Sequence, residues 1–239
     1  MLGIIGGSGL YQLVKGEEKT VKTEFGEATA VLARISGKNC AFIARHGKTH
    51  SIPPHMINHR ANVSALKKLG ATDILAISSV GVISDYELGD LIIVRDFISF
   101  GPGPTFFDDF SGGIAHTDMT EPYSPELAKS LIEGARNEEI RIQDGGILAH
   151  TSGPRFETKA EIKALSKMGA NLVGMTSVPE AILANELEIR FANLAIASNY
   201  ACGISKNPLT VEEVLEIARK KEDDIKRIIR RLTQSPQLP

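Results

Sequence analysis

Short runs of apolar, often β-branched residues alternate with stretches of helical periodicity along most of the chain. Continuous apolar runs such as Leu91 to Val94 are typical of strands that are covered on both faces, as in a parallel sheet. Further strands are predicted over residues 2–5, 29–35, 40–44, 73–79, 147–151, 172–175 and 191–197. This alternation predicts one α/β domain with helices on both faces of the sheet.

Apolar residues spaced three and four apart predict the helices. One such stretch runs from Ile57 to Leu69, and a capping-box pattern at Thr210 and Glu213 begins a long amphipathic helix that reaches residue 232. Residues 233–239 are expected to form a frayed tail. The other helices are expected over 124–137, 159–168 and 179–187, with a Gly/Pro-rich loop over 100–113.

Length and composition indicate an ordinary globular protein. The 239 residues, 42% hydrophobic and 23% charged, fit a single domain over residues 1–239. The 27 basic against 29 acidic residues leave a net charge of −2, so neither a nucleic acid nor a membrane is an expected partner. Cys40 and Cys202 form no paired motif, which fits a reducing cytoplasmic location.

Polar clusters follow the predicted strands early in the chain, where ligands of α/β sheets collect. The turn Gly6-Gly7-Ser8-Gly9 offers converging backbone N–H groups and a hydroxyl, as do Ser78 and Ser79. Arg45 and His46 can bind a phosphate dianion through charge-assisted hydrogen bonds. A tight turn explains the glycine segment equally well when it is taken alone, a helix cap or plain turn explains Ser78-Ser79 at least as well, and a surface basic cluster is the favoured explanation of Arg45-His46 by itself.

A second group of candidates lies late in the chain. Phe156 can stack on a flat heterocycle while Glu157 accepts a hydrogen bond from the edge of that ring. Thr176 and Glu180 follow another strand, and Asn199 follows the last one. The carboxylates can equally be acids that favour a helix start. Four histidines occur within residues 46–59, but no H-E-x-x-H pattern accompanies them, so a metal site is not expected.

Taken together, the clusters identify a resemblance to the trimeric purine nucleoside phosphorylase family, within its 5'-methylthioadenosine and S-methyl-5'-thioinosine phosphorylase branch. The resemblance implies a single-domain α/β fold around a mixed, partly barrel-like central sheet flanked by helices. It also implies a homotrimer, which in some members pairs into a dimer of trimers. The matching stretches are residues 3–10, 44–47, 58–66, 89–90, 121–125, 153–156 and 175–180.

The family reaction is reversible phosphorolysis, in which phosphate attacks the anomeric carbon of a nucleoside and releases the base. The resemblance implies inorganic phosphate as co-substrate, no cofactor and no metal. It places Met175 under the ribose, Phe156 against the base and His116 in the pocket of a neighbouring subunit. It assigns phosphate binding to Ser8, Arg45, His46, Ser78, Ser79 and Thr176, and catalysis to Asn199, Glu157 and His46.

The positions that face the base depart from the methylthioadenosine branch, which has Asp-Tyr-Asp where this chain has Asn199-Tyr200-Ala201 and a small hydroxyl residue at Glu157. Glu157 can accept from the N1–H of a 6-oxopurine, and the Asn199 amide can donate to its N7 or O6. Against adenine, Glu157 would face a lone pair and Ala201 would offer nothing to the amino group. Hydrogen-bonding sites of this kind discriminate by roughly 10⁴–10⁵.

The start of the last helix bears on the 5' substituent of the nucleoside. Val211 stands where ordinary purine nucleoside phosphorylases have a histidine, and Val214 and Leu215 follow one turn later. An apolar wall suits a methylthio group, which predicts S-methyl-5'-thioinosine as substrate, with inosine and guanosine as further ones. These residues can instead form the buried stripe of the helix. Two other functions remain open: a methylthioadenosine phosphorylase with unusual base contacts, and a nucleoside-binding protein without phosphorolysis.

Overall fold

A nine-stranded mixed sheet forms the centre of the computed structural model, which describes residues 1–10, 13–101, 103–205, 210–236 and 238. The strand order is β2-β3-β4-β1-β5-β8-β7-β6-β9, and β9 also pairs with β5. The strands are β1 Leu2–Gly6, β2 Glu17–Thr23, β3 Gly26–Ile35, β4 Lys38–Ala44, β5 Asp73–Val82, β6 Leu91–Ile98, β7 Gln143–His150, β8 Leu172–Gly174 and β9 Arg190–Tyr200.

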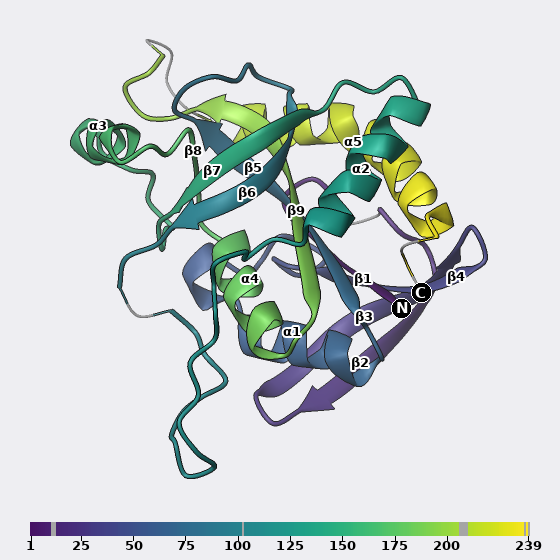
Figure 1. Cartoon of the computed structure of the whole chain (residues 1–239). Helices are drawn as coiled ribbons and strands as arrows, with labels where there is room; N and C mark the ends of the chain where they lie inside the picture. The colour runs from purple at the N-terminus through teal and green to yellow at the C-terminus, as the bar shows by residue number, and fades with distance from the viewer. Residues whose placement is uncertain (11–12, 102, 206–209, 237, 239) are drawn as a thin grey trace.

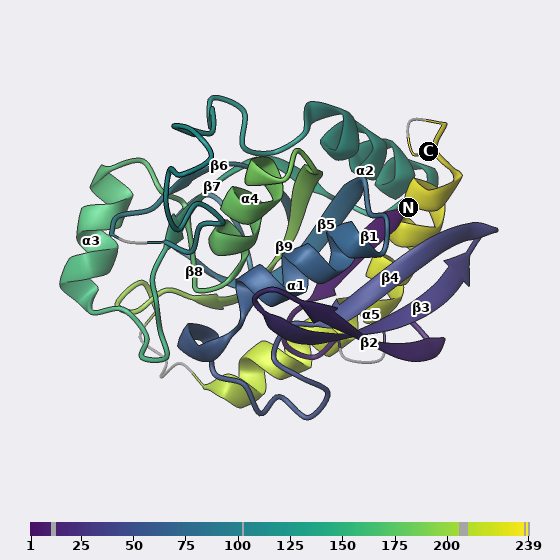
Figure 2. The same cartoon turned by 90° about the horizontal axis from the view of Figure 1, so that it is seen from below.

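Helices cover both faces of this sheet (Figures 1 and 2). One apolar core lies between the sheet and α1 and α4, and a second core lies between the sheet and α2 and α5. The smaller α3 lies to one side over a third cluster. The helices are α1 His59–Lys68, α2 Pro125–Asn137, α3 Lys159–Lys167, α4 Ser177–Glu186 and α5 Val211–Gln234, with a 3-10 turn at Pro54–Met56.

β5 is the strand that both layers share. Ile74 and Ala76 belong to the core beneath α1 and α4, whereas the intervening Leu75 and Ile77 belong to the core beneath α2 and α5. Because successive side chains of a strand point to opposite faces, an uninterrupted apolar run is what a strand buried on both faces requires. The expectation from the hydrophobic pattern is therefore confirmed at the centre of the sheet.

The partly barrel-like character of the sheet comes from the second pairing of β9. β5 pairs with β8, β8 with β7, β7 with β6 and β6 with β9, and β9 then returns to β5 along its whole length. The five strands therefore form a closed ring. β1 and β4 extend the sheet outward from β5 as parallel neighbours, and β3 and β2 complete it in antiparallel fashion.

Most predicted elements are present, with two differences. β2 was not expected, because its sequence is polar and only Val21 is buried. It lies at the outer edge of the sheet, where one side of a strand faces water. At the other end of the chain, α5 continues through Thr233 to Gln234, and Leu238 is buried, with its carbonyl oxygen accepting from Lys38 Nζ at 3.1 Å. Gln237 and Pro239 of the predicted tail lie outside the described residues.

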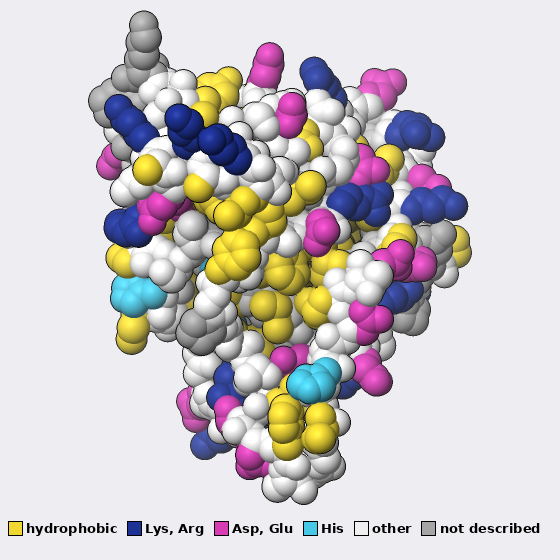
Figure 3. Space-filling model, turned by 60° about the vertical axis from the view of Figure 1, so that its left-hand side comes forward, with side chains coloured by type: hydrophobic (Ala, Val, Ile, Leu, Met, Phe, Trp, Pro, Cys, Tyr) yellow, Lys and Arg dark blue, Asp and Glu magenta, His cyan; other side chains and the backbone are white. Residues whose placement is uncertain are grey.

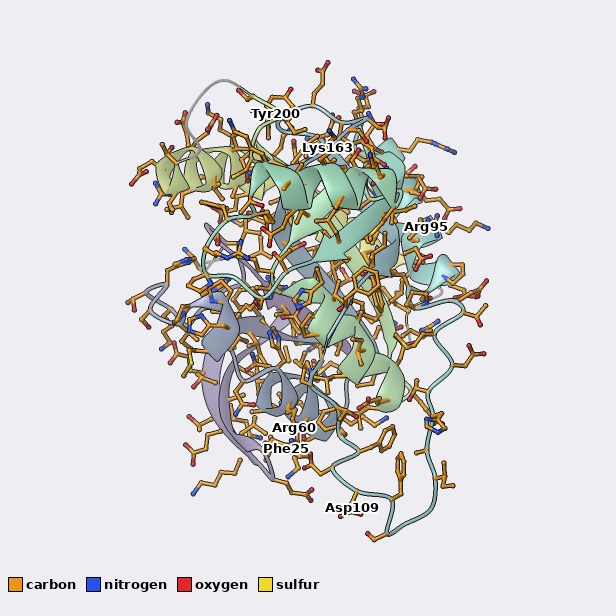
Figure 4. All side chains as sticks on the ribbon, turned by 90° about the vertical axis from the view of Figure 1, so that its left-hand side faces the viewer. Phe25, Arg60, Arg95, Asp109, Lys163 and Tyr200 are labelled. Carbon is orange, nitrogen blue, oxygen red and sulfur yellow. The ribbon has the colours of Figure 1, made fainter. Side chains whose placement is uncertain are left out.

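A long loop between β6 and α2 projects from the body of the protein (Figure 1). Arg60 of α1 ties the outer part of the loop to the body of the protein through a two-bonded ion pair with Asp108, and it stacks over the Phe25 ring, 4.1 Å from its centroid. Figure 4 shows Phe25 and Arg60 together beside α1, with Asp109 at the lower tip of the loop. Among the described residues, no helix is both long and apolar enough to span a bilayer.

Candidate active site

A cavity of about 210 Å³ lies at the carboxyl ends of β1, β4, β7, β8 and β9, beside β5. It is bounded by the loops that follow these strands and by the first turn of α5. Eleven residues that the sequence singled out line it: Ser8, Arg45, His46, Ser79, Phe156, Glu157, Met175, Thr176, Asn199, Val211 and Val214. Candidate residues from near the start of the chain and from near its end therefore line the same cavity.

The cavity lies where the sheet divides. On one edge of β5, β1 pairs with Asp73 to Ile77, and β8 pairs only with Gly81 and Val82. Within the described residues no strand pairs with Ser78–Val80 on that edge. Ser79 lies in this gap, and its hydroxyl oxygen is buried without a hydrogen-bond partner. A buried hydroxyl requires a partner, so this one fits a ligand that supplies it.

Arg45 and the glycine turn form one wall of the cavity. Arg45 is 1% exposed, and its Nη1 donates to the Ile77 carbonyl oxygen at 2.9 Å. A Cβ atom on Gly7 would lie 2.7 Å from this nitrogen, so only glycine allows the turn to approach the guanidinium so closely. Ser8 follows Gly7 and lines the same cavity. Tyr11 and Gln12, farther along the turn, lie outside the described residues.

His46 and His50 stack beside Arg45, with ring centroids 4.6 Å apart. Burial, together with the positive charge of Arg45, lowers the pKa of His46 from its ordinary 6.5 to about 4. The ring is therefore neutral near pH 7. Its Nδ1 lies 2.8 Å from the Ile52 carbonyl oxygen, which only accepts, so Nδ1 carries the hydrogen and Nε2 remains an acceptor.

The N-terminus of α4 borders the cavity beside Thr176. Thr176 occupies the N-cap position, yet its side chain makes no capping hydrogen bond, in contrast to the caps of α1, α2, α3 and α5. The first backbone N–H groups of a helix and its dipole favour an anion. Together with the unpartnered Ser79 hydroxyl, this helix end has the donor chemistry that suits a small oxyanion.

A carboxylate and an amide lie at the other end of the cavity. Glu157 is buried, and its Oε1 accepts from the Thr151 hydroxyl at 2.6 Å, which leaves Oε2 for a ligand. The Asn199 amide donates to the Tyr200 carbonyl oxygen at 3.2 Å, and its Oδ1 lies 3.0 Å from the Ser198 hydroxyl. One Asn199 amide hydrogen therefore remains. Phe156, 38% exposed, is the aromatic face beside them.

The middle and the mouth of the cavity are apolar. A Cβ atom on Gly153 would lie 2.5 Å from Met175 Sδ, and Gly153 has a φ of +64°, so this position requires glycine for Met175 to lie where it does. Val211 and Val214, on the first turn of α5, also line the cavity. Val211 is 51% exposed, and the buried stripe of α5 begins only at Ala218. Val211 is therefore not part of that stripe.

Four predicted site residues do not line the cavity of their own chain. Ser78 lies within β5, not after it, and its hydroxyl donates to Asn193 Oδ1 at 2.9 Å because neighbouring strand residues face opposite sides. Ala201 is 2% exposed in the cluster beneath α3. Leu215 lies on the turn of α5 after Val214 and is not among the lining residues. His116 lies on the projecting loop, against the Phe110 ring.

The sequence also missed contributors to the cavity. His50 was considered only as a metal ligand, and Pro54 and Pro154 had no predicted role, yet all three line the cavity. His50 can stack on His46 only because the loop after β4 folds back on itself. The Pro53-Pro54 pair is only a weak indication of such a turn in the sequence. In the described parts of the chain, no group of three or more His, Cys, Asp or Glu side chains is arranged to hold a metal ion.

Comparisons with known proteins show what the chain is similar to. The sequence profile of the phosphorylase superfamily matches residues 1–234. The chain is 44% identical to the 6-oxopurine nucleoside phosphorylase of Pyrococcus furiosus, with 100% of this chain and 93% of the relative covered. It is 42% identical to a probable S-methyl-5'-thioinosine phosphorylase of Methanopyrus kandleri, covering 92% and 86%. The structure resembles the methylthioadenosine phosphorylase of Schistosoma mansoni in complex with adenine, with a TM-score of 0.91, 32% identity and 98% and 90% coverage.

Proposed function

The chain belongs to the phosphorylase superfamily, and on that premise we propose that it catalyses the reversible phosphorolysis of 6-oxopurine nucleosides, with S-methyl-5'-thioinosine preferred over inosine and guanosine. The products are the free base and (5-methylthio)ribose 1-phosphate. The observation that carries the proposal is the pairing, in one cavity, of an oxyanion site with a carboxylate and an amide that match a keto-purine edge.

The oxyanion site is where inorganic phosphate binds. Ser8, Ser79 and Thr176 supply hydroxyls, Arg45 supplies charge-assisted N–H groups, and α4 supplies its N-terminus. His46 has an acceptor at Nε2, which suits the O–H of a monohydrogen phosphate ion. Phosphate needs no activation by a covalent enzyme nucleophile, so the contribution of the protein is to hold it against the anomeric carbon.

The carboxylate and the amide read the base. A phosphate oxygen forms a bond to the anomeric carbon while the bond from that carbon to the purine nitrogen breaks, and the electron pair of the broken bond stays on the purine. The remaining Asn199 amide hydrogen stabilises this charge at N7 or O6, and Glu157 Oε2 accepts from N1–H. An adenine would present a lone pair to that oxygen, which argues against a methylthioadenosine substrate.

The apolar mouth supports the preference for a methylthio group. Val211 and Val214 offer no hydrogen bond to a 5'-hydroxyl, and burying an unpartnered hydroxyl against them is unfavourable. Curated relatives named as probable S-methyl-5'-thioinosine phosphorylases, such as that of Methanocaldococcus jannaschii at 43% identity, are consistent with this preference.

The working form of the enzyme is proposed to be a homotrimer in which His116 completes the pocket of a neighbour. His116 lies on the projecting loop, where Phe110 and Ile114 are 49% and 79% exposed. Figure 3 shows hydrophobic side chains gathered across the middle of one face and on the lobe below it. Mixed trimers of Arg45→Ala and His116→Ala chains are expected to regain part of the activity that each variant lacks, because some pockets then combine two intact contributions. Mixtures no more active than the separate variants would contradict this arrangement.

One assay tests the function itself. Initial rates of base release are measured with S-methyl-5'-thioinosine, inosine, guanosine, adenosine and methylthioadenosine, each with and without phosphate. We expect phosphate-dependent release that is fastest with S-methyl-5'-thioinosine and slow with both 6-aminopurine nucleosides. Faster release from methylthioadenosine would overturn the base assignment. Ligand binding that is indifferent to phosphate, without release, would indicate a nucleoside-binding protein instead.

A further inference from the structure

Glu180 is a buried acid that lies behind the cavity and does not line it. It stands in the first turn of α4, is 0% exposed, and forms a two-bonded ion pair with Arg45. Arg45 Nε donates to Oε1 at 2.5 Å, and Nη2 donates to Oε2 at 2.7 Å. Burial raises the pKa of Glu180, but the charge and hydrogen bonds of Arg45 outweigh it and hold that pKa below its usual value. Glu180 is therefore ionised near pH 7.

The ion pair with Glu180 leaves some of the Arg45 N–H donors for a ligand. A guanidinium has five N–H groups. Glu180 takes one on Nε and one on Nη2, and the Ile77 carbonyl oxygen takes one on Nη1. Two N–H groups remain, one on each terminal nitrogen of Arg45. Each terminal nitrogen therefore keeps one N–H group that can donate to an oxygen of an anion.

Three neighbours hold the Arg45 guanidinium in place from different sides. Glu180 fixes the guanidinium from α4, the Ile77 carbonyl oxygen fixes it from β5, and Gly7 approaches its Nη1 from the glycine turn. On the far side of Glu180, His59 Nδ1 lies 3.6 Å from Oε1. The carboxylate thus connects α1, α4 and the loop after β4 at a single buried point.

We propose that Glu180 is a positioning residue for phosphate binding: it orients Arg45 so that its two remaining N–H groups point at the anion. This inference rests on the proposed phosphorolysis. It differs from a purely structural role, because the first turn of α4 has a separate attachment to the sheet. Ser78 donates to Asn193, and the Asn193 amide donates to the Ser177 hydroxyl at 2.8 Å.

The ion pair also sets the charge of the site. Glu180 cancels the charge of Arg45, and His46 is neutral near pH 7, so these three groups together carry no net charge. Phosphate is then held mainly by directed N–H and O–H groups, and its binding depends on their geometry. Such a site loses affinity for phosphate when the Arg45 N–H groups are misaligned, even though the guanidinium itself is still charged.

The test compares two buried acids that each pair with an arginine. Glu180→Gln keeps the volume of the side chain but turns one acceptor into a donor that faces Arg45. We expect the KM for phosphate to rise at least tenfold, with the KM for the nucleoside within about twofold of the wild type. Asp73→Asn is the matched control, because Asp73 is equally buried and pairs with Arg190 at 2.6 Å, at the opposite end of β5. It should leave both KM values unchanged.

A double-mutant cycle separates positioning from general destabilisation. If Glu180 acts through Arg45, Glu180→Gln adds less than twofold to the phosphate KM of an Arg45→Ala chain. Fully multiplicative effects, or an unchanged phosphate KM in Glu180→Gln, would overturn the inference. Should Glu180→Gln not fold, Glu180→Asp, which shortens the side chain by one methylene group and withdraws the carboxylate from Arg45, is held to the same criteria. A wild-type protein that releases base without phosphate would instead refute the proposed function.

Discussion

Replacing Glu157 with glutamine tests how the cavity reads a purine. The change preserves shape and burial but replaces one carboxylate oxygen with an NH₂ group. The Thr151 hydroxyl donates to Oε1 at 2.6 Å, so the glutamine keeps its oxygen there and presents Nε2 to the ligand. A 6-oxopurine then meets a donor with its own N1–H, whereas a 6-aminopurine presents the N1 lone pair that this donor can use.

The expected magnitude follows from the kind of hydrogen bond that is exchanged. Glu157 is 6% exposed, so its bond to the base is a buried, charge-assisted one. Its loss costs about 1.5–3 kcal/mol, which lowers kcat/KM for inosine by about 10- to 150-fold. A new neutral bond to adenosine contributes about 0.5–1.5 kcal/mol, or about 2- to 12-fold. The inosine-to-adenosine ratio should therefore fall by about 20- to 1,800-fold.

The assay measures initial rates of base release from both nucleosides at saturating phosphate. Thr151→Val is the matched control: it removes the orienting hydrogen bond but keeps the carboxylate, so both rates fall while their ratio moves by less than about threefold. The Thr151 hydroxyl can also rotate and accept a hydrogen bond from the glutamine NH₂ group, which would turn the glutamine oxygen toward the ligand. Combining Glu157→Gln with Thr151→Val excludes this alternative. If the ratio stays at its wild-type value in this double variant, Glu157 does not contact the base edge.

Two further predictions concern the 5' substituent and acid stability. Val211→His places a donor at the mouth of the cavity, and kcat/KM for inosine should rise about 2- to 10-fold relative to S-methyl-5'-thioinosine; an unchanged ratio would remove Val211 from the 5' contact. Burial, with a further contribution from His59, lowers the pKa of His150 to about 4 from an ordinary 6.5. Between these values the unfolded chain binds more protons than the folded one, so stability falls as pH drops from 7 to 5. His150→Gln should remove about 1–2 kcal/mol of that fall, measured by thermal unfolding at both pH values, and an equal fall in both proteins would contradict it.

The periodic elements and the loops that carry the site could be predicted from local sequence, because each depends on neighbouring residues. Ser124 and Thr210 cap α2 and α5 as their positions suggested. Arg45 and Asn199 were predicted as candidates because each lies at the carboxyl end of an apolar strand, where a parallel sheet gathers ligands. The polar β2 was missed because an edge strand needs little apolar surface.

Contacts between distant segments could not be predicted. The partner of Arg45 is 135 residues away, and nothing near Glu180 distinguishes it from an acid that favours a helix start. Ser78 and Ser79 are identical neighbours, and only the register of β5 decides which of them faces the cavity. Ala201 follows the same strand as Asn199, but the chain turns it into the cluster beneath α3.

The gap on the edge of β5 at Ser78–Val80 links ligand binding to the stability of the whole domain. β5 is the strand that the open sheet and the closed ring share, so a phosphate bound at this gap, as proposed above, would contact both parts of the fold. Binding to the folded form alone adds about 1.4 kcal/mol for each tenfold excess of phosphate over its dissociation constant. The melting temperature should therefore rise with phosphate concentration, and slowed amide exchange along β5 should accompany that rise.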